Sequence, residues 1–179
     1  MIELVKIEDL NEVLRIYNNI KNEMRELGNP QWGSTEEDYP SDEMLKEDIL
    51  KGTMFKYVED GVIKGVFSLV EDEREYDEVI ENSQEKSYII HRLAVPVEFR
   101  KQNIATNLIA YAEGLASANG AILMKSDTEI SNDKMNRLFE KLGYFHKGIF
   151  TYDDYPGTYN YYEKDIKRRW HIWVTRLLS

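Results

Sequence analysis

Apolar residues recur at every third or fourth position in several segments of this chain, which is the spacing of amphipathic helices. The clearest example is the segment 10–27, whose last apolar residue is followed directly by Gly28. The same spacing predicts helices over residues 41–50, 104–119 and 132–142. Glycine also follows the last two segments directly, and glycine is the residue that most often ends a helix.

The segments between these helices carry alternating or continuous apolar residues, which is typical of β-strands. Two of them flank Asp60 and Gly61, a dipeptide that favours a two-residue type I′ hairpin turn. The predicted strands are residues 1–7, 53–59, 62–71, 87–95, 121–125, 147–153 and 158–164. The resulting order is β-α-α-β-β-β-α-β-α-β-β. Because no repeat or linker interrupts it, we predict one domain of the mixed α/β (α+β) class.

The composition is that of a soluble globular protein, since 42% of the 179 residues are hydrophobic and 31% are charged. No apolar run approaches the roughly 18 residues of a membrane span, and no signal-peptide pattern begins the chain. We therefore expect no membrane partner. The sequence contains no cysteine, which excludes disulfides, thiolate metal sites and a cysteine nucleophile. These features favour a cytoplasmic location.

The formal net charge of −10 argues against a nucleic-acid partner, because phosphate backbones require a basic surface. An acidic surface could steer a cationic amine toward the protein, although solubility alone is the simpler explanation. The end of the chain differs, because residues 167–169 are basic and Trp170 and Trp173 follow at helical spacing. This tail could dock on the protein body, contact acidic lipid, or contact a second subunit in a homodimer. We favour packing within the chain or in the dimer.

The stretch 90–105 carries the strongest chemical signal. An apolar strand ends at Val95, basic side chains follow at Arg100 and Lys101, and a helix begins near Ile104. At the start of a helix the free backbone N–H groups and the helix dipole both favour an anion. A strand, a loop and a helix N-terminus in this order therefore predict a phosphate-binding site.

This loop resembles the acyl-CoA loop of the GNAT N-acetyltransferases, whose pattern is Gln/Arg-x-x-Gly-x-Gly/Ala. Arg100, Ile104 and Ala105 fit the pattern, whereas Asn103 replaces its first glycine. Asparagine tolerates the left-handed backbone better than other residues that carry a side chain. We therefore expect the loop to survive this replacement.

A second segment, residues 132–144, strengthens the resemblance. It contains Leu-Phe-Glu-Lys-Leu-Gly-Tyr after Asn132, similar to the family's Asn-(x)n-Leu-Tyr-Glu-Lys-Leu-Gly-Phe/Tyr. Together with the order of elements, the resemblance covers residues 1–166, and residues 167–179 form a C-terminal extension of the same domain. It implies the GNAT fold, a central, mixed, mostly antiparallel twisted sheet with helices on both faces.

The resemblance implies that acetyl-CoA binds in a cleft between the fourth and fifth predicted strands. Backbone groups of the strand would meet the thioester and pantetheine arm, and loop amides would hold the pyrophosphate. The expected contacts are Leu93, Ala94, Val95, Arg100, Lys101, Gln102, Asn103, Ile104, Ala105, Asn132 and Phe139. Arg100 and Lys101 could add charge or simply be solvated, and Asn132 could instead cap a helix.

Acyl transfer to an amine requires a base for the nucleophile and stabilisation of the departing thiolate. His91 is the candidate base, because it can titrate near neutrality and strand alternation places it beside Leu93 and Val95. A hydrogen-bonded core histidine is the alternative. The family's general-acid tyrosine corresponds to Phe139, so either the thiolate leaves without an acid or Tyr144 replaces that tyrosine. No spacing of metal ligands is recognisable, and we expect no metal.

The acceptor pocket is expected at the loop after the first helix, the central strands and the final hairpin. Its candidates are aromatic residues and one acid that could attract an ammonium group: Trp32, Tyr39, Asp127, Tyr152, Tyr155 and Tyr159. Aromatic residues in loops are also ordinary packing anchors.

These residues together predict an N-acetyltransferase that moves an acetyl group from acetyl-CoA to a primary amine of a small molecule. Direct attack in a ternary complex fits best, because no residue supports a covalent acyl-enzyme as well. Two alternatives stay open. One is an acyl-CoA-binding regulator with little or no turnover, and the other is an acetyltransferase of a protein or peptide amine.

Overall fold

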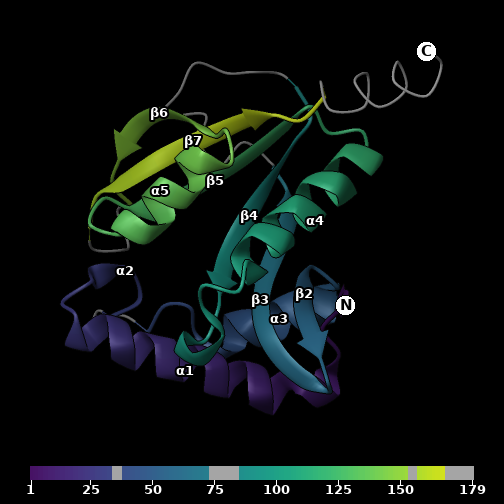
Figure 1. Ribbon diagram of the computed structural model, residues 1–179, viewed down its shortest axis with the longest axis vertical. Helices are drawn as coiled ribbons and strands as arrows, with labels where there is room; N and C mark the ends of the chain where they lie inside the picture. Colours follow the sequence, from purple (N-terminus) through teal and green to yellow (C-terminus); the bar gives the residue numbers. More distant parts are fainter. Residues whose placement is uncertain (34–37, 73–84, 153–156, 168–179) are drawn as a thin grey trace.

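A seven-stranded sheet with helices on both faces organises the part of the chain that this computed structural model describes, residues 1–33, 38–72, 85–152 and 157–167 (Figure 1). The strands are β1 (Ile2–Leu4), β2 (Met54–Glu59), β3 (Val62–Glu71), β4 (Ser87–Ala94), β5 (Leu123–Glu129), β6 (Phe145–Phe150) and β7 (Tyr159–Asp165). The helices are α1 (Leu10–Glu26), α2 (Pro30–Gly33), α3 (Asp42–Lys51), α4 (Ile104–Ala118) and α5 (Asp133–Lys141). Two 3₁₀ turns, Ile7–Asp9 and Val97–Phe99, complete the described elements.

The order of the main elements confirms the predicted one. The strand order in the sheet is β1-β2-β3-β4-β5-β7-β6, and only the β4–β5 pair is parallel among the described strands. The turn at Asp60 and Gly61 also has the predicted form, with φ of 52° and 74°. Several details differ. The first strand is shorter than residues 1–7, and the short helix α2 was not predicted. The strands predicted at 121–125 and 147–153 are Leu123–Glu129 and Phe145–Phe150.

Two hydrophobic clusters fix the helices to the two faces of the sheet. One contains the inward residues of α4 together with Phe67 and Leu69 of β3, and Phe139 of α5 packs into it. The other lies under α1 and α3 and includes Val66 of β3. Helices on both faces, as predicted, therefore follow from the alternation of side chains along β3.

Gly65 of β3 allows α4 to approach the sheet closely. A Cβ atom added at Gly65 would lie 2.9 Å from Cγ2 of Ile104 and 3.0 Å from Cδ1 of Leu108. Both distances are shorter than ordinary carbon contacts of about 3.5–4.0 Å. The first turn of α4 therefore rests directly on the backbone of β3.

A β-bulge and a separation of strands shape the centre of the sheet. Val66 of β3 pairs with Ala94 and Ser68 pairs with His91, so that two residues of β4 face one residue of β3. One of these two, Arg92, has φ of 54°. On the other side, β4 pairs with β5 only over Ser87↔Leu123 to Ile89↔Lys125. Beyond these pairs the two strands separate (Figure 1).

Two further expectations concern a membrane-spanning helix and the C-terminal extension. Within the described residues, no helix combines the length and the apolar character that crossing a bilayer requires. Residues 168–179, which include most of the predicted C-terminal extension, lie outside the described residues.

Candidate active site

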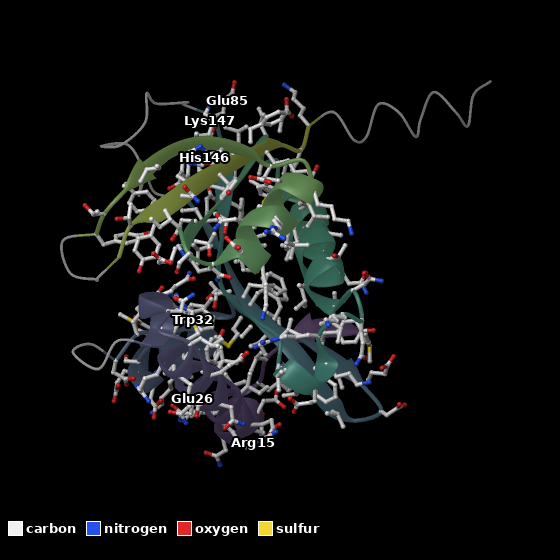
Figure 2. All side chains as sticks on the ribbon, turned by 60° about the vertical axis from the view of Figure 1, so that its left-hand side comes forward. Arg15, Glu26, Trp32, Glu85, His146 and Lys147 are labelled. Atoms are coloured by element: carbon white, nitrogen blue, oxygen red, sulfur yellow. The ribbon has the colours of Figure 1, made fainter. Side chains whose placement is uncertain are left out.

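A cavity of about 350 Å³ lies where β4 and β5 separate. Nine of the residues predicted from the sequence line it, namely Trp32, Tyr39, His91, Leu93, Asp127, Asn132, Phe139, Tyr152 and Tyr159. Tyr155, also a candidate, lies outside the described residues. In Figure 2, Trp32 lies between the helical part of α1 and α2 and the sheet part of β5 to β7. His146, by contrast, lies on β6 at the outer edge. We call this cavity the central cleft.

His91 borders the central cleft, but not on the side that strand alternation predicts. Leu93 and Val95 pack against the cluster under α4. Ser68, the cross-strand partner of His91, instead donates a hydrogen bond of 2.5 Å to Asp48 of α3, on the opposite face. The prediction that His91 shares a side with Leu93 and Val95 is therefore wrong, because the bulge inserts one residue and reverses the alternation after it.

Arg92, the bulge residue, is held by a buried network at the floor of the central cleft. Its Nε donates to Asp48 Oδ2 at 2.9 Å and its Nη2 to Asp48 Oδ1 at 3.1 Å. Its Nη1 donates to the hydroxyl of Tyr39 at 3.2 Å, and the Tyr17 hydroxyl donates to its backbone carbonyl at 2.5 Å. These contacts stabilise the left-handed backbone at Arg92.

The charges of this network balance each other. The side chains of Arg92 and Asp48 are only 14% and 10% exposed. Burial alone would lower the pKa of Arg92, but attraction to Tyr39 and the hydrogen bonds with Asp48 outweigh it and raise the pKa above its ordinary value. Arg92 is therefore a permanent cation, and its charge is matched by Asp48.

Gln31 of α2 ties the two sides of the central cleft together, and the sequence interpretation did not identify it. Its Oε1 accepts hydrogen bonds from Asn132 Nδ2 at 3.0 Å and from Thr128 Oγ1 at 3.2 Å. Asn132 also caps α5, because its Oδ1 accepts from the backbone N–H of Met135 at 3.4 Å. The capping role considered for Asn132 is thus present, and its side chain faces the cleft as well.

The loop before α4 has the shape of an anion site. Lys101 and Asn103 both have left-handed backbones, with φ of 63° and 61°, as expected for Asn103. The Asn103 side chain makes no capping hydrogen bond to α4. The first backbone N–H groups of a helix have no partner within it, so those of Ile104 and Ala105 are available to an anion. The side chains of Lys101 and Gln102 are exposed beside them.

Two of the expected cofactor residues are available only through their backbones. The side chains of Ala94 and Ile104 are 2% and 3% exposed and belong to the two hydrophobic clusters. A bound molecule could therefore meet their main-chain atoms but not their side chains.

The side chain of Arg100 is directed toward α1, and not toward the N-terminus of α4 where a phosphate would bind. Its Nη1 and Nη2 donate to the two carboxylate oxygens of Glu23 on α1, both at 2.5 Å, and its Nε donates to the carbonyl of Val95 at 3.0 Å. The hydrogen bonds from Arg100 lower the pKa of the Glu23 carboxyl. Arg100 thus fixes the loop to α1, and its guanidinium is already occupied by a carboxylate.

Tyr144 is placed away from the central cleft, which contradicts its candidacy as a proton donor. It is 3% exposed, its ring lies 5.1 Å from that of Phe139, and the ammonium of Lys164 lies 5.1 Å from its ring centre. Phe139 lines the cleft and is 1% exposed, between Tyr144 and Tyr162. The tyrosine two residues after Leu142 therefore packs in the core instead of reaching the reacting atoms.

Few of the described side chains that line the central cleft can take part in acyl transfer. His91 is the candidate base, Asp127 contributes a carboxyl group, and Phe139 stands where the resemblance implies a tyrosine. No group of three or more His, Asp or Glu side chains among the described residues could hold a metal ion. The arrangement is suited to proton transfer from an amine beside an anion-binding loop.

Comparisons with known proteins agree with this arrangement. The model of the acetyltransferase (GNAT) family matches residues 21–144, which include the loop before α4 and all of α5. A search of curated proteins found no match.

Solved structures show the same fold. One is an acetyltransferase of the GNAT family from Streptococcus agalactiae 2603, with 24% identity and a TM-score of 0.79 over 92% of this chain and 94% of that chain. Another, assigned as an acetyltransferase, is from Staphylococcus aureus Mu50, with 27% identity and a TM-score of 0.70 over 93% and 99%. A third, from Listeria monocytogenes 4b F2365, is 17% identical with a TM-score of 0.72 over 92% and 94%. Since the family match spans the anion loop, the separated strands and α5, this chain belongs to the GNAT family of acetyltransferases.

Proposed function

We propose that this protein transfers an acetyl group from acetyl-CoA to a primary amine of a small molecule. The observation that carries the proposal is the central cleft between β4 and β5, which lies in the same part of the sheet as an uncapped helix N-terminus. Members of this family normally use acetyl-CoA. The two features match two parts of such a substrate, its pyrophosphate and its reactive thioester.

The residues present are of the kinds that would hold acetyl-CoA at this site. The N–H groups at the start of α4 and the exposed Lys101 would hold the pyrophosphate. Leu93 and Asn132, which line the central cleft, would contact the pantetheine arm. The bound thioester supplies an acyl group activated toward amines.

Proton transfer falls to His91 in this proposal. A primary amine attacks the thioester only in its neutral form, so His91 would accept the amine proton directly or through a water. Phe139 donates no proton, so the thiolate would leave without a general acid; this is feasible because a thiolate is a weakly basic leaving group. A direct reaction in a ternary complex requires no covalent intermediate on the protein.

The remaining expectations stay proposals of the same kind. The absence of cysteine from the sequence supports a cytoplasmic location. A homodimer is a further proposal, and so is the assignment of residues 1–166 to the acetyltransferase domain.

Calorimetry with acetyl-CoA, followed by thiol release with a panel of primary amines, tests the proposal. Ala105→Glu places a negative charge at the anion site, and we expect it to weaken acetyl-CoA binding at least about 10-fold. The matched control is Ala110→Glu, since Ala110 is exposed further along α4, and it should keep wild-type affinity. If millimolar acetyl-CoA does not bind, or if Ala105→Glu binds as tightly as Ala110→Glu, the proposal is wrong.

A further inference from the structure

We infer that the acceptor is a primary amine on a small aromatic or similarly flat apolar body, without a carboxylate. This inference rests on the proposed function and specifies its acceptor. It comes from three properties of the central cleft: its aromatic walls, the engagement of its polar groups, and the neutralisation of its guanidinium.

Aromatic rings stand on both sides of the central cleft. Trp32 and Tyr39 line the side of α1 to α3, and Tyr152 and Tyr159 line the side of β6 and β7. Further rings hold these side chains in place. Trp32 lies 5.5 Å from Tyr17, and Tyr152 lies 5.2 Å from Tyr159, measured between ring centres. Fixed aromatic walls favour a flat apolar body, which makes offset and edge contacts with them.

Three methionines, Met24, Met44 and Met135, also line the central cleft. Their side chains are apolar and adaptable, and their sulfur atoms make favourable contacts with aromatic rings. The cleft therefore offers an acceptor apolar and polarisable surface next to its polar groups.

Several amide and hydroxyl groups of the cleft are engaged within the protein. Gln31 Oε1 accepts from both Thr128 and Asn132, and the Ser126 hydroxyl donates to the carbonyl of Ile90 at 3.0 Å. An acceptor rich in hydroxyl groups would have to break these bonds or lose its own water. Burying polar groups without partners is costly, so such acceptors are disfavoured.

The charges of the cleft favour binding of amines without a carboxylate over amines that carry one. Arg92 is the only Lys or Arg side chain among the described lining residues, and Asp48 already binds it through two hydrogen bonds. A carboxylate on the acceptor would be desolvated without a new cation to meet it. Asp127 is an acidic residue of the same lining, and a nearby carboxyl group favours an ammonium over a carboxylate.

A panel of four amines tests the inference by the rate of thiol release from acetyl-CoA. 2-Phenylethylamine and phenylalanine share the ring and the amine and differ in the carboxylate, while hexylamine and spermidine test the apolar body and a second charge. We expect kcat/KM for 2-phenylethylamine to exceed the values for phenylalanine and spermidine by at least about 30-fold. Equal or higher kcat/KM for phenylalanine or spermidine would overturn the inference and leave the proposed function intact.

A pair of variants locates the preference in the aromatic wall. Tyr152→Leu should lower kcat/KM for 2-phenylethylamine about 10-fold and change that for hexylamine much less. Tyr111→Leu is the matched control, because Tyr111 lies on α4 against Phe55, outside the cleft lining, and it should keep the wild-type preference. An equal loss for both amines in Tyr152→Leu would contradict the aromatic assignment.

Equilibrium binding keeps the inference testable if the protein proves inactive. The affinities of 2-phenylethylamine and phenylalanine are measured by NMR titration of the protein, with and without CoA. Tighter binding of 2-phenylethylamine supports the inference even where acetyl-CoA fails to bind, a result that would refute the proposed function alone. Equal or tighter binding of phenylalanine would overturn the inference.

Discussion

Replacing Gly65 by alanine tests how the anion loop is positioned. Gly65 lies on β3 directly beneath the first turn of α4, and an added Cβ would contact Ile104 at 2.9 Å and Leu108 at 3.0 Å. The two side chains are 3% and 0% exposed, so neither can turn outward into solvent. The helix itself must therefore move away from the sheet, or the contacts must remain compressed.

The expected magnitude follows from two opposing effects. Inserting a methyl group into a well-packed core costs about 1–3 kcal/mol. Alanine also restricts the unfolded chain, which offsets about 0.4–1 kcal/mol of that cost where the backbone is compatible. We therefore expect Gly65→Ala to lower the free energy of unfolding by about 1–2 kcal/mol. Because Ile104 begins α4, the same movement should also weaken acetyl-CoA binding.

Urea unfolding followed by circular dichroism, together with calorimetry for acetyl-CoA, measures both effects. Gly114→Ala on α4 is the matched control, since a Cβ atom there meets no atom within 4 Å. That substitution should raise the free energy of unfolding by about 0.5–1 kcal/mol, because glycine is unfavourable inside a helix. If Gly65→Ala is as stable as the wild type, α4 is not held against β3 as described.

Three further predictions concern the loop and the core. Since the hydrogen bonds from Arg100 lower the pKa of Glu23, this carboxylate adds stability above its unfolded pKa of about 4.3 and loses it as the pH falls through the lower folded pKa. Glu23→Gln should therefore cost about 1 kcal/mol at pH 7, and urea unfolding at a series of pH values should show the difference shrinking as the pH falls below about 4.3; a constant difference would contradict the ion pair. Asn103→Ala should unfold about 1 kcal/mol more easily than Asn103→Gly in thermal melts, because its φ is 61°, and equal stabilities would refute a left-handed backbone there. Tyr144→Phe should keep kcat within about 2-fold, and a loss of 100-fold, typical of a removed general acid, would show that the tyrosine reaches the cleft after all.

Much of the fold could be predicted because local patterns and tertiary packing agree. The helices at residues 10–27 and 104–119 have continuous apolar stripes, and each stripe meets one face of the sheet. The hairpin at Asp60 and Gly61 is likewise local, since its backbone angles depend on those two residues. Such features need no knowledge of distant contacts.

The errors at the site come from contacts that are distant in the sequence. The bulge at Arg92 is held by Asp48, Tyr39 and Tyr17, which lie far from it in the chain, so alternation alone misplaced His91. Arg100 was considered either as a charge for a phosphate or as a solvated side chain, and neither alternative anticipated its partner Glu23, which is 77 positions away.

Gln31 was missed for a related reason. It is a single polar residue in a four-residue helix, and its partners Thr128 and Asn132 are about one hundred positions further on. In the sequence, the only indication of a role for Gln31 was its position beside Trp32, in a segment between two predicted helices.

The short parallel pairing between β4 and β5 has a consequence for amide hydrogen exchange. Within the described residues, the backbones of these two strands pair at three positions, close to a buried ion pair of 2.5 Å between Lys125 and Asp72. The first four strands and the last three are thus joined by backbone pairs at one end only, whereas at the other end side-chain hydrogen bonds such as those of Gln31 connect the two halves. A ligand bound between the separated ends of β4 and β5 would contact both halves of the sheet. It would therefore slow amide hydrogen exchange on both strands, including positions far from its own contacts.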